Sequence, residues 1–160
     1  MKKKFTHIGA KNQAKMVDVT NKKVTKRKAT AKATMFLGSA IISKFNNNEL
    51  ITKKGPVFQT AIVAGIQAVK RTPDLIPMCH PLMIGAVEID INITDNEHIE
   101  ILCSVSIEGK TGVEMEALTG ASITALTVYD MCKSISQKMV IKEVKLISKS
   151  GGKSDINECL

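Results

Sequence analysis

A chain of 160 residues is long enough to form one domain with its own core, without a disulfide or a metal to hold it together. A hydrophobic content of 44% excludes a disordered chain, and no apolar run reaches the roughly 18 residues that a membrane span needs. The net charge of +8 is uneven, because residues 1–32 hold 11 basic groups and one acidic group, whereas the rest of the chain holds 12 and 14. An excess in one segment does not identify a nucleic-acid-binding protein, so we expect no specific nucleic-acid partner and a solvated tail at Lys2–Lys4.

Cysteine usage and the basic start of the chain bear on the compartment. The four cysteines form no CxxC pair, which argues against zinc-ribbon and thioredoxin motifs. The residues MKKKF lead into no apolar stretch, so we expect no signal peptide. A cytoplasmic protein without membrane contact is therefore expected.

The first part of the chain predicts an extended segment, a strand and a short helix. Residues 1–28 are polar and basic, and they are expected to lead into a single domain at 29–154. Alternating small and polar residues predict a strand at 30–37. A short helix is expected at 38–45, and the asparagines of 46–49 predict a turn.

A second helix is expected at 57–71, with Pro56 at its start and no charge before Lys70. A helix without charge on any side is typical of a buried helix. A proline-containing loop at 73–81 follows. Two segments that alternate apolar and polar residues, 87–93 and 99–107, then predict a β-hairpin.

The last elements are a long helix at 113–138, a strand at 140–147, a flexible basic loop at 149–154 and a frayed tail at 155–160. The complete order is β-α-α-β-β-α-β. Omitting one helix leaves the split βαββαβ order of a ferredoxin-like sheet. We therefore predict a two-layer α+β fold with a ferredoxin-like sheet and an additional helix.

Charges at the end of the long helix are the first candidates for chemistry. No charge occurs from Ala117 to Tyr129, and Asp130 and Lys133 then lie three residues apart on one helix face. The pair has two interpretations, a structural surface ion pair or a pair with a chemical role. The pattern alone slightly favours the structural pair, because Asp130 lies opposite the stripe of residues expected to face the sheet.

Further candidates lie near turns. Glu114 and Glu116 are in the first helical turn, where carboxylates also complement the helix dipole without any chemistry. Residues 110–112 could offer backbone N–H groups to an anion, although they form no P-loop. His80 follows Cys79 in the proline-containing loop, but other ligands at standard spacing are missing, so we expect no metal site.

Basic residues beside turns and element ends form a set of plausible phosphate partners. They are Lys53, Lys54, Lys70, Arg71, Lys149 and Lys153. The residues alone thus indicate a small α+β protein, oligomeric, that handles an anionic ligand.

Five segments form long and specific motifs. They are MVDVT (16–20), KGPVFQTAIVAGIQAVKRT (54–72), DLIPMCHPL (74–82), KTGVEMEALTGASITALTVYDMCK (110–133) and KSGGKS (149–154). In this order they closely resemble the MoaC family, and the resemblance extends from residue 6 to about residue 154.

The resemblance implies an accessory cyclic pyranopterin monophosphate synthase of molybdenum cofactor biosynthesis. Such a lyase converts 3′,8-cyclo-7,8-dihydroguanosine 5′-triphosphate to cyclic pyranopterin monophosphate and releases pyrophosphate. No tightly bound cofactor is implied, although Mg²⁺ can accompany the triphosphate. The family's ferredoxin-like subunits assemble as a homohexamer, a trimer of dimers, whose active sites draw on neighbouring subunits.

The resemblance also assigns residues to the site. Asp130 and Lys133 match the catalytic pair of the family. Substrate-site residues are matched by Met78, Cys79, His80, Glu114, Met115, Glu116, Lys54, Lys149 and Arg27. Pro56 departs from the pattern, because an acidic residue is expected after Lys54 and Gly55. This change is expected to alter the start of the helix and to leave Lys54 in place.

An oligomer is also expected from the two helices, which would otherwise expose an apolar surface larger than soluble monomers tolerate. We expect basic residues such as Lys54 or Arg27 to reach the Asp130 site of a neighbouring subunit. Two rival classes are an RNA-binding module and a ligand-binding protein without turnover. The first is disfavoured because the hairpin strands contain no aromatic residue on which bases could stack, and the second stays open.

Overall fold

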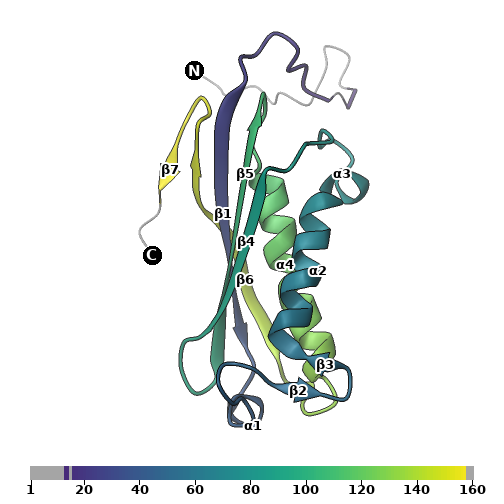
Figure 1. The fold of residues 1–160 in the computed structure, drawn as a ribbon, viewed down its shortest axis with the longest axis vertical. Helices are drawn as coiled ribbons and strands as arrows, with labels where there is room; N and C mark the ends of the chain where they lie inside the picture. The colour runs from purple at the N-terminus through teal and green to yellow at the C-terminus, as the bar shows by residue number, and fades with distance from the viewer. Residues whose placement is uncertain (1–12, 15, 158–160) are drawn as a thin grey trace.

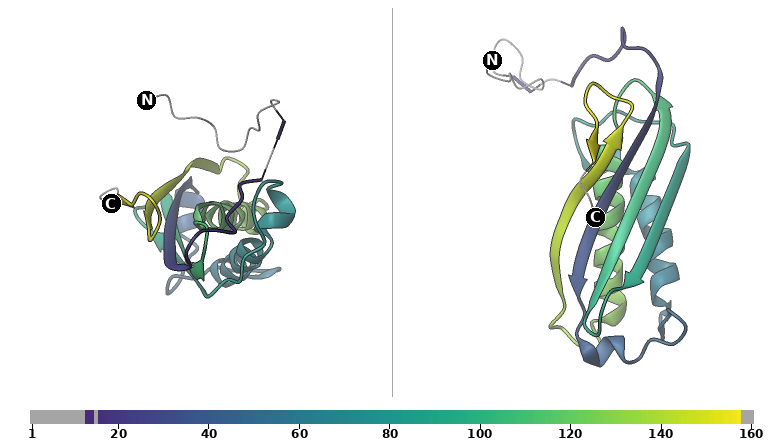
Figure 2. Two further views of the ribbon diagram at one scale, coloured as in Figure 1. Left: turned by 90° about the horizontal axis from the view of Figure 1, so that it is seen from above. Right: turned by 90° about the vertical axis from the view of Figure 1, so that its left-hand side faces the viewer.

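The computed structural model describes residues 13–14 and 16–157 and has two layers (Figure 1). Lys2–Lys4 and the last three residues of the expected tail lie outside the described residues. One layer is an antiparallel sheet, and the other contains two long helices side by side on one face of it (Figure 2). The predicted α+β class is therefore confirmed. In the described part of the chain, no helix has the length and apolar character needed to cross a membrane.

The sheet has the predicted ferredoxin-like connectivity. From one edge to the other it contains β4 (Ala86–Ile93), β5 (His98–Gly109), β1 (Thr25–Phe36), β6 (Val140–Ser150) and β7 (Ile156–Asn157), each antiparallel to its neighbours. The crossover from β1 to β4 passes over β5, and the crossover from β5 to β6 passes over β1. Each crossover thus joins two parallel strands with one antiparallel strand between them, which is the split βαβ arrangement.

The helical layer consists of α2 (Val57–Lys70) and α4 (Glu114–Cys132). Smaller elements flank it: α1 (Ser39–Ile42), α3 (Thr72–Leu75) and the short hairpin of β2 (Ile51–Thr52) and β3 (Gly55–Pro56). The core lies between the layers, where the inward residues of β1 meet the small residues of α4. Alternation along β1 buries its alanines and Met35, which are at most 1% exposed.

The two long helices approach closely at paired glycines. A Cβ at Gly65 of α2 would overlap with Thr124 Oγ1 of α4, and a Cβ at Gly120 of α4 would overlap with Cys103 Sγ of β5. Thr124 donates its hydroxyl hydrogen bond to the Gly120 carbonyl at 2.8 Å, so its polar group is satisfied inside the core. Because Gly65 and Gly120 have no side chain, α2 can lie close to α4, and α4 can lie close to the sheet.

Several element boundaries differ from those predicted. The strand predicted at 30–37 begins at Thr25, because its pairing with β5 continues as far as Gly109. The helix predicted at 113–138 ends at Cys132, where the chain turns toward β6 and the Ile135 amide bonds to the Cys132 carbonyl. The short helix predicted at 38–45 covers only Ser39–Ile42.

Differences also occur in the loops. The loop predicted at 73–81 starts inside α3. The last strand continues to Ser150, and Ile156–Asn157 pairs with Ser148 and Lys149. Part of the predicted basic loop and part of the predicted tail therefore belong to the sheet.

Candidate active site

The predicted site residues lie at opposite ends of α4. The N-end cluster contains Arg27, Met78, Cys79, His80, Glu114, Met115, Glu116 and Lys149, which line two cavities beside the first turn of α4. The C-end cluster contains Lys54, Asp130 and Lys133. Glu114 and Asp130 are 16 residues apart on α4, which at 1.5 Å per residue corresponds to about 24 Å. One chain therefore presents two partial sites rather than one complete site.

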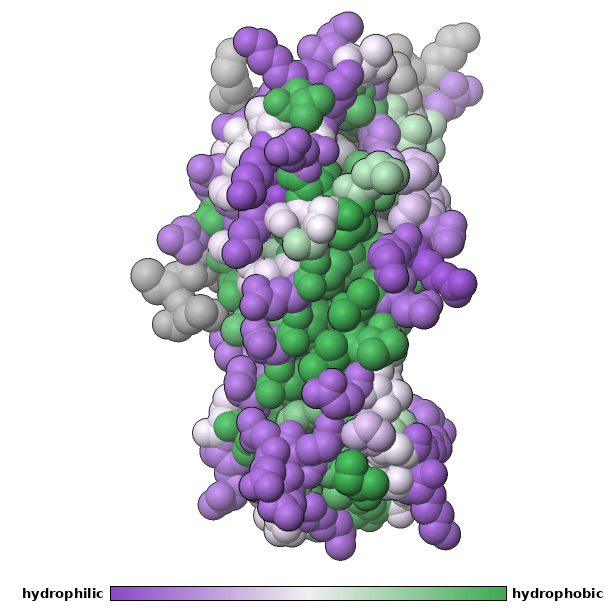
Figure 3. Space-filling model, in the orientation of Figure 1, coloured by the Kyte–Doolittle hydropathy of each residue, from purple (hydrophilic) through white to green (hydrophobic). Residues whose placement is uncertain are grey.

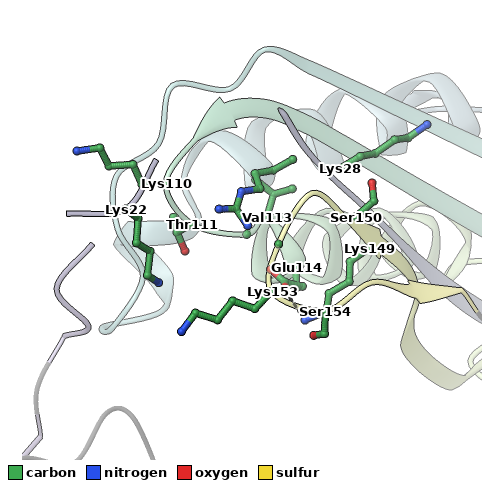
Figure 4. A pocket seen from close by; sticks show the side chains of 13 residues that line it. Lys22, Lys28, Lys110, Thr111, Val113, Glu114, Lys149, Ser150, Lys153 and Ser154 are labelled. Atoms are coloured by element: carbon green, nitrogen blue, oxygen red, sulfur yellow. Dashed lines mark hydrogen bonds and ion pairs between the residues drawn. The ribbon is translucent and has the colours of Figure 1, made fainter. Parts of the chain in front are cut away.

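The N-end cluster surrounds a larger cavity of about 460 Å³ and a smaller one of about 160 Å³ that share part of their walls. Chain segments far apart in sequence supply these walls. The loop after α3 lines the larger cavity, and the start of α4 and the end of β6 line both cavities, as Figure 4 shows for the smaller one. The smaller cavity is strongly basic, since one carboxylate, Glu114, faces six cationic side chains. These are Lys22, Arg27, Lys28, Lys110, Lys149 and Lys153. Such a wall favours an anionic ligand.

Glu114 joins the helix to the sheet at this cavity. Its Oε1 accepts a hydrogen bond from Lys149 Nζ at 3.0 Å, and both side chains are about one quarter to one third exposed. The absence of a side chain at Gly112 makes room for this carboxylate, because a Cβ there would overlap with it. The Glu114 carboxyl group is therefore held against the basic wall.

Glu116 lies in the same helical turn but in a different environment. Its residue is only 3% exposed, and it lines the larger cavity with Cys79 and His80. Burial raises the pKa of Glu116, and the charge of Glu114 adds to the effect. Burial likewise raises the pKa of the Cys79 thiol, so this cysteine is not an activated nucleophile. Two carboxylates with different environments are the arrangement from which separate acid and base roles arise.

The C-end cluster places one carboxylate between two ammonium groups. Lys54 Nζ lies 2.6 Å from Asp130 Oδ2, and Lys133 Nζ lies 2.7 Å from Asp130 Oδ1. Lys54 also donates to the Asp130 carbonyl at 3.2 Å, where a cation complements the C-terminal end of a helix dipole. All three side chains are about half exposed. Within one chain, this is the geometry of a surface ion pair extended by a third partner.

The protonation states of this cluster follow from its hydrogen bonds. The bonds from Lys133 and then Lys54 lower the pKa of Asp130 to about 2. The bond to Asp130 raises the pKa of Lys133. At neutral pH the cluster thus contains a carboxylate and a firmly protonated Lys133, which suits a cation or proton donor better than a base.

The expectation that basic residues such as Lys54 or Arg27 reach the Asp130 site of a neighbouring subunit stays a prediction. Within one chain, Lys54 contacts Asp130, because the β2–β3 hairpin carries it to the end of α4. Arg27 lies in the N-end cluster, far from the Asp130 of its own chain. Among the described residues, no group of three or more His, Cys, Asp or Glu side chains could hold a metal ion.

Comparison with known proteins agrees with the motifs. The sequence profile of the MoaC family matches residues 16–152, a range that contains both clusters. The chain belongs to the MoaC family. The molybdenum cofactor biosynthesis protein 1 of Dictyostelium discoideum is 48% identical over 167 residues, which cover 94% of this chain and 26% of the relative. The molybdenum cofactor biosynthesis bifunctional protein of a Synechocystis species is 49% identical over 158 residues, covering 96% of this chain and 46% of the relative. The chain therefore spans about a quarter of one relative and about half of the other.

The MoaC motifs locate most of the N-end cluster but not all of its cations. Lys22 and Lys28 line the smaller cavity and were not among the predicted site residues. Lys28 pairs with Ser150 in the sheet register, a contact that follows only once β1 is known to begin at Thr25. Of the other predicted phosphate partners, Lys153 lines both cavities, whereas Arg71 lines an apolar groove beside α2.

Proposed function

We propose that this MoaC-family chain is a cyclic pyranopterin monophosphate synthase in molybdenum cofactor biosynthesis. The proposed reaction converts 3′,8-cyclo-7,8-dihydroguanosine 5′-triphosphate to cyclic pyranopterin monophosphate and pyrophosphate. The observation that carries the proposal is the N-end cavity, in which a strongly basic wall adjoins a buried carboxylate. The names of both relatives refer to molybdenum cofactor biosynthesis and support the same pathway.

The N-end cluster fits the polar parts of this substrate. The cations of the smaller cavity would bind the triphosphate and stabilise the charge that develops as pyrophosphate leaves. Glu116, whose pKa is raised by burial, would act at the ring system as a proton donor or acceptor. Glu114 would accept the hydrogen bond from Lys149 and orient that ammonium group. The reaction needs no electron transfer, so we propose no tightly bound cofactor, and Mg²⁺ can enter with the triphosphate.

The C-end cluster would supply the catalytic pair. Lys133 is held protonated by Asp130, so it can stabilise an oxyanion or donate a proton during ring opening and closure. A separation of about 24 Å along α4 exceeds the length of one nucleoside triphosphate. We therefore propose that each complete active site combines the N-end cluster of one subunit with the C-end cluster of another.

The apolar surface of the chain fits such an assembly. Figure 3 shows a band of hydrophobic side chains down the middle of the face that contains β4 and α2. Val63 of α2 is 58% exposed and Leu126 of α4 is 53% exposed, and no charge occurs on α2 before Lys70. Soluble monomers rarely expose such a surface. We propose that it is covered by further subunits in a homohexamer, a trimer of dimers, located in the cytoplasm.

Turnover of the cyclised nucleotide is the direct test. The purified chain is incubated with 3′,8-cyclo-7,8-dihydroguanosine 5′-triphosphate, and the pterin product and pyrophosphate are measured together. Stoichiometric formation of both is expected, and the Lys133→Ala variant serves as the matched inactive control. Tight binding of the nucleotide without product would instead identify a ligand-binding protein without turnover.

A further inference from the structure

Helix α2 begins without a cap of its own. Its N-cap residue is Pro56, which makes no side-chain capping bond. Proline has neither a hydroxyl nor a carboxylate with which to accept the free N–H groups of the first turn. Such groups need partners from elsewhere.

Glu49 supplies these partners from outside the helix. Its Oε1 accepts the amide of Phe58 at 2.9 Å, and its Oε2 accepts the amide of Gln59 at 3.1 Å. The same Oε1 accepts the amide of Leu50 at 2.9 Å, and the Leu50 carbonyl accepts the amide of Val57 at 2.9 Å. The first three amides of α2 are therefore bonded to two consecutive residues that precede the β2–β3 hairpin.

The hairpin between these contacts carries Lys54. Ile51 pairs with Pro56 and Thr52 pairs with Gly55, so the hairpin is short and its base is closed by the Glu49 contacts. At its tip, the Lys54 amide donates to Thr52 Oγ1 at 3.1 Å. The Lys54 side chain is half exposed, so little packing fixes it, and its place depends on the backbone that presents it.

Glu49 also lies close to the end of α4. Burial raises the pKa of the Cys132 thiol to about 11, and the negative charge of Glu49 adds to this effect. Cys132 is the last residue of α4 and immediately precedes Lys133. The carboxylate thus stands where the start of α2, the hairpin and the end of α4 meet.

We propose that Glu49 is a positioning residue, which caps α2 from outside the helix and thereby holds the hairpin in the place from which Lys54 reaches Asp130. Its catalytic consequence rests on the proposed function, whereas its geometric consequence does not. Loss of the cap would release the hairpin base, move Lys54 away from Asp130 and leave Lys133 as the partner of that carboxylate.

The geometric test is a titration of the Asp130 carboxyl carbon by NMR in the full chain. The variants are Glu49→Ala, Glu49→Gln and Lys54→Met, with Glu88→Ala on the exposed outer face of β4 as the matched control. The pKa of Asp130, about 2 in the wild type, is expected to rise toward its ordinary 3.8 in Lys54→Met and by a similar amount in Glu49→Ala. The Gln variant should give a smaller rise, because its amide can accept the Phe58 bond but not the Gln59 bond as well.

The outcomes of this titration are distinct. An Asp130 pKa unchanged from the wild type in a folded Glu49→Ala variant would overturn the proposal. Should Glu49→Ala fail to fold, Glu49→Gln decides the question, because it preserves side-chain size and one of the two helix contacts. A wild-type Asp130 pKa in that variant would also overturn the proposal. The Glu88→Ala control should titrate as the wild type does.

The kinetic test is a double-mutant cycle. Glu49→Ala is expected to lower kcat about 10- to 100-fold, as Lys54→Met does, with a smaller change in KM. The double variant should be no slower than Lys54→Met alone, because both changes remove the same contact. Additive losses would contradict action through Lys54. An inactive wild type would refute the proposed function and leave the titration to decide the role of Glu49.

Discussion

At the residue scale, each end of α4 has a distinct electrostatic character. Glu114 is paired with Lys149, Glu116 is buried and protonates more readily, and Asp130 is held ionised by two lysines. The exposure of the Asp130 cluster argues against a stabilising role, since exposed ion pairs contribute little to folding. A group that contributes little to stability yet carries a family motif is the first target for mutation.

We predict that Lys133→Ala and Asp130→Ala each lower kcat by at least about 100-fold while the protein stays folded. The thermal midpoint should stay close to that of the wild type, because both side chains are about half exposed. Steady-state kinetics and calorimetry on the same preparations check both parts. Normal turnover in either variant would refute the catalytic assignment, and loss of the fold in both would support a structural ion pair.

Glu116→Gln should make the protein more stable at pH 7 and inactive. Because burial raises the folded-state pKa of Glu116 above 4.5, the unfolded chain releases this proton first as the pH rises. The side chain therefore lowers the free energy of unfolding progressively above pH 4.5 and fully above its folded-state pKa. Urea denaturation at several pH values should show that the free energy of unfolding of Glu116→Gln exceeds that of the wild type. This difference should grow with pH and disappear in acid. A constant difference across the pH range would argue against a raised pKa, and Glu88→Gln on the outer sheet face is the matched control.

At the element scale, local patterns predicted some elements and not others. Apolar and polar residues alternate with a period of two along 87–93 and 99–107, as expected for strands with one buried face. The hairpin could therefore be predicted from the sequence. The end of α4 could not be predicted from the sequence. Residues 133–138 contain good helix formers, and only the return of the chain toward β6 ends the helix. β7 has two residues and exists through its pairing with β6, which no local propensity encodes.

Some contacts of the candidate site could likewise be predicted from the sequence, whereas others could not. Asp130 and Lys133 share one helix turn, so their contact could be predicted from spacing. Lys54 joins them across 76 positions of sequence, and Glu49 caps a helix from nine residues before Phe58. Neither contact matches a local capping or ion-pair motif, so tertiary structure was needed to find them.

Gly120→Ala is predicted to destabilise the protein by about 1–3 kcal/mol through overpacking. The added Cβ would overlap with Cys103 Sγ and with Val69, so α4 would have to move away from its neighbours. The loss should appear even though alanine favours helix formation by about 1 kcal/mol over glycine. Urea denaturation measures the change. Gly65→Ala provides the comparison on the facing helix, and equal stability of both variants with the wild type would show that the helix spacing adapts without cost.

At the scale of the whole molecule, the apolar helix surface predicts the oligomeric state. Sedimentation equilibrium should give a mass near six times the 17.4 kDa of one chain. Val63→Lys places a charge on the exposed middle of α2 and should shift the protein toward smaller species with at least about a tenfold loss of turnover. A stable and active monomer would exclude the hexamer and the shared sites together.

The division of α4 into two clusters allows a complementation test of those shared sites. Mixing inactive Lys149→Ala chains with inactive Lys133→Ala chains should restore up to about one quarter of wild-type activity, because each site takes one cluster from each of two subunits in a closed assembly. The matched control mixes Lys54→Ala with Lys133→Ala. Both residues belong to the C-end cluster of one chain, where each contacts the same Asp130, so every hybrid site still carries one of the two defects. The activity of this mixture should not exceed that of the two variants measured separately. Recovery in the control but not in the first mixture would show that Lys54 acts on a neighbouring subunit and that both ends of α4 serve one site within a chain.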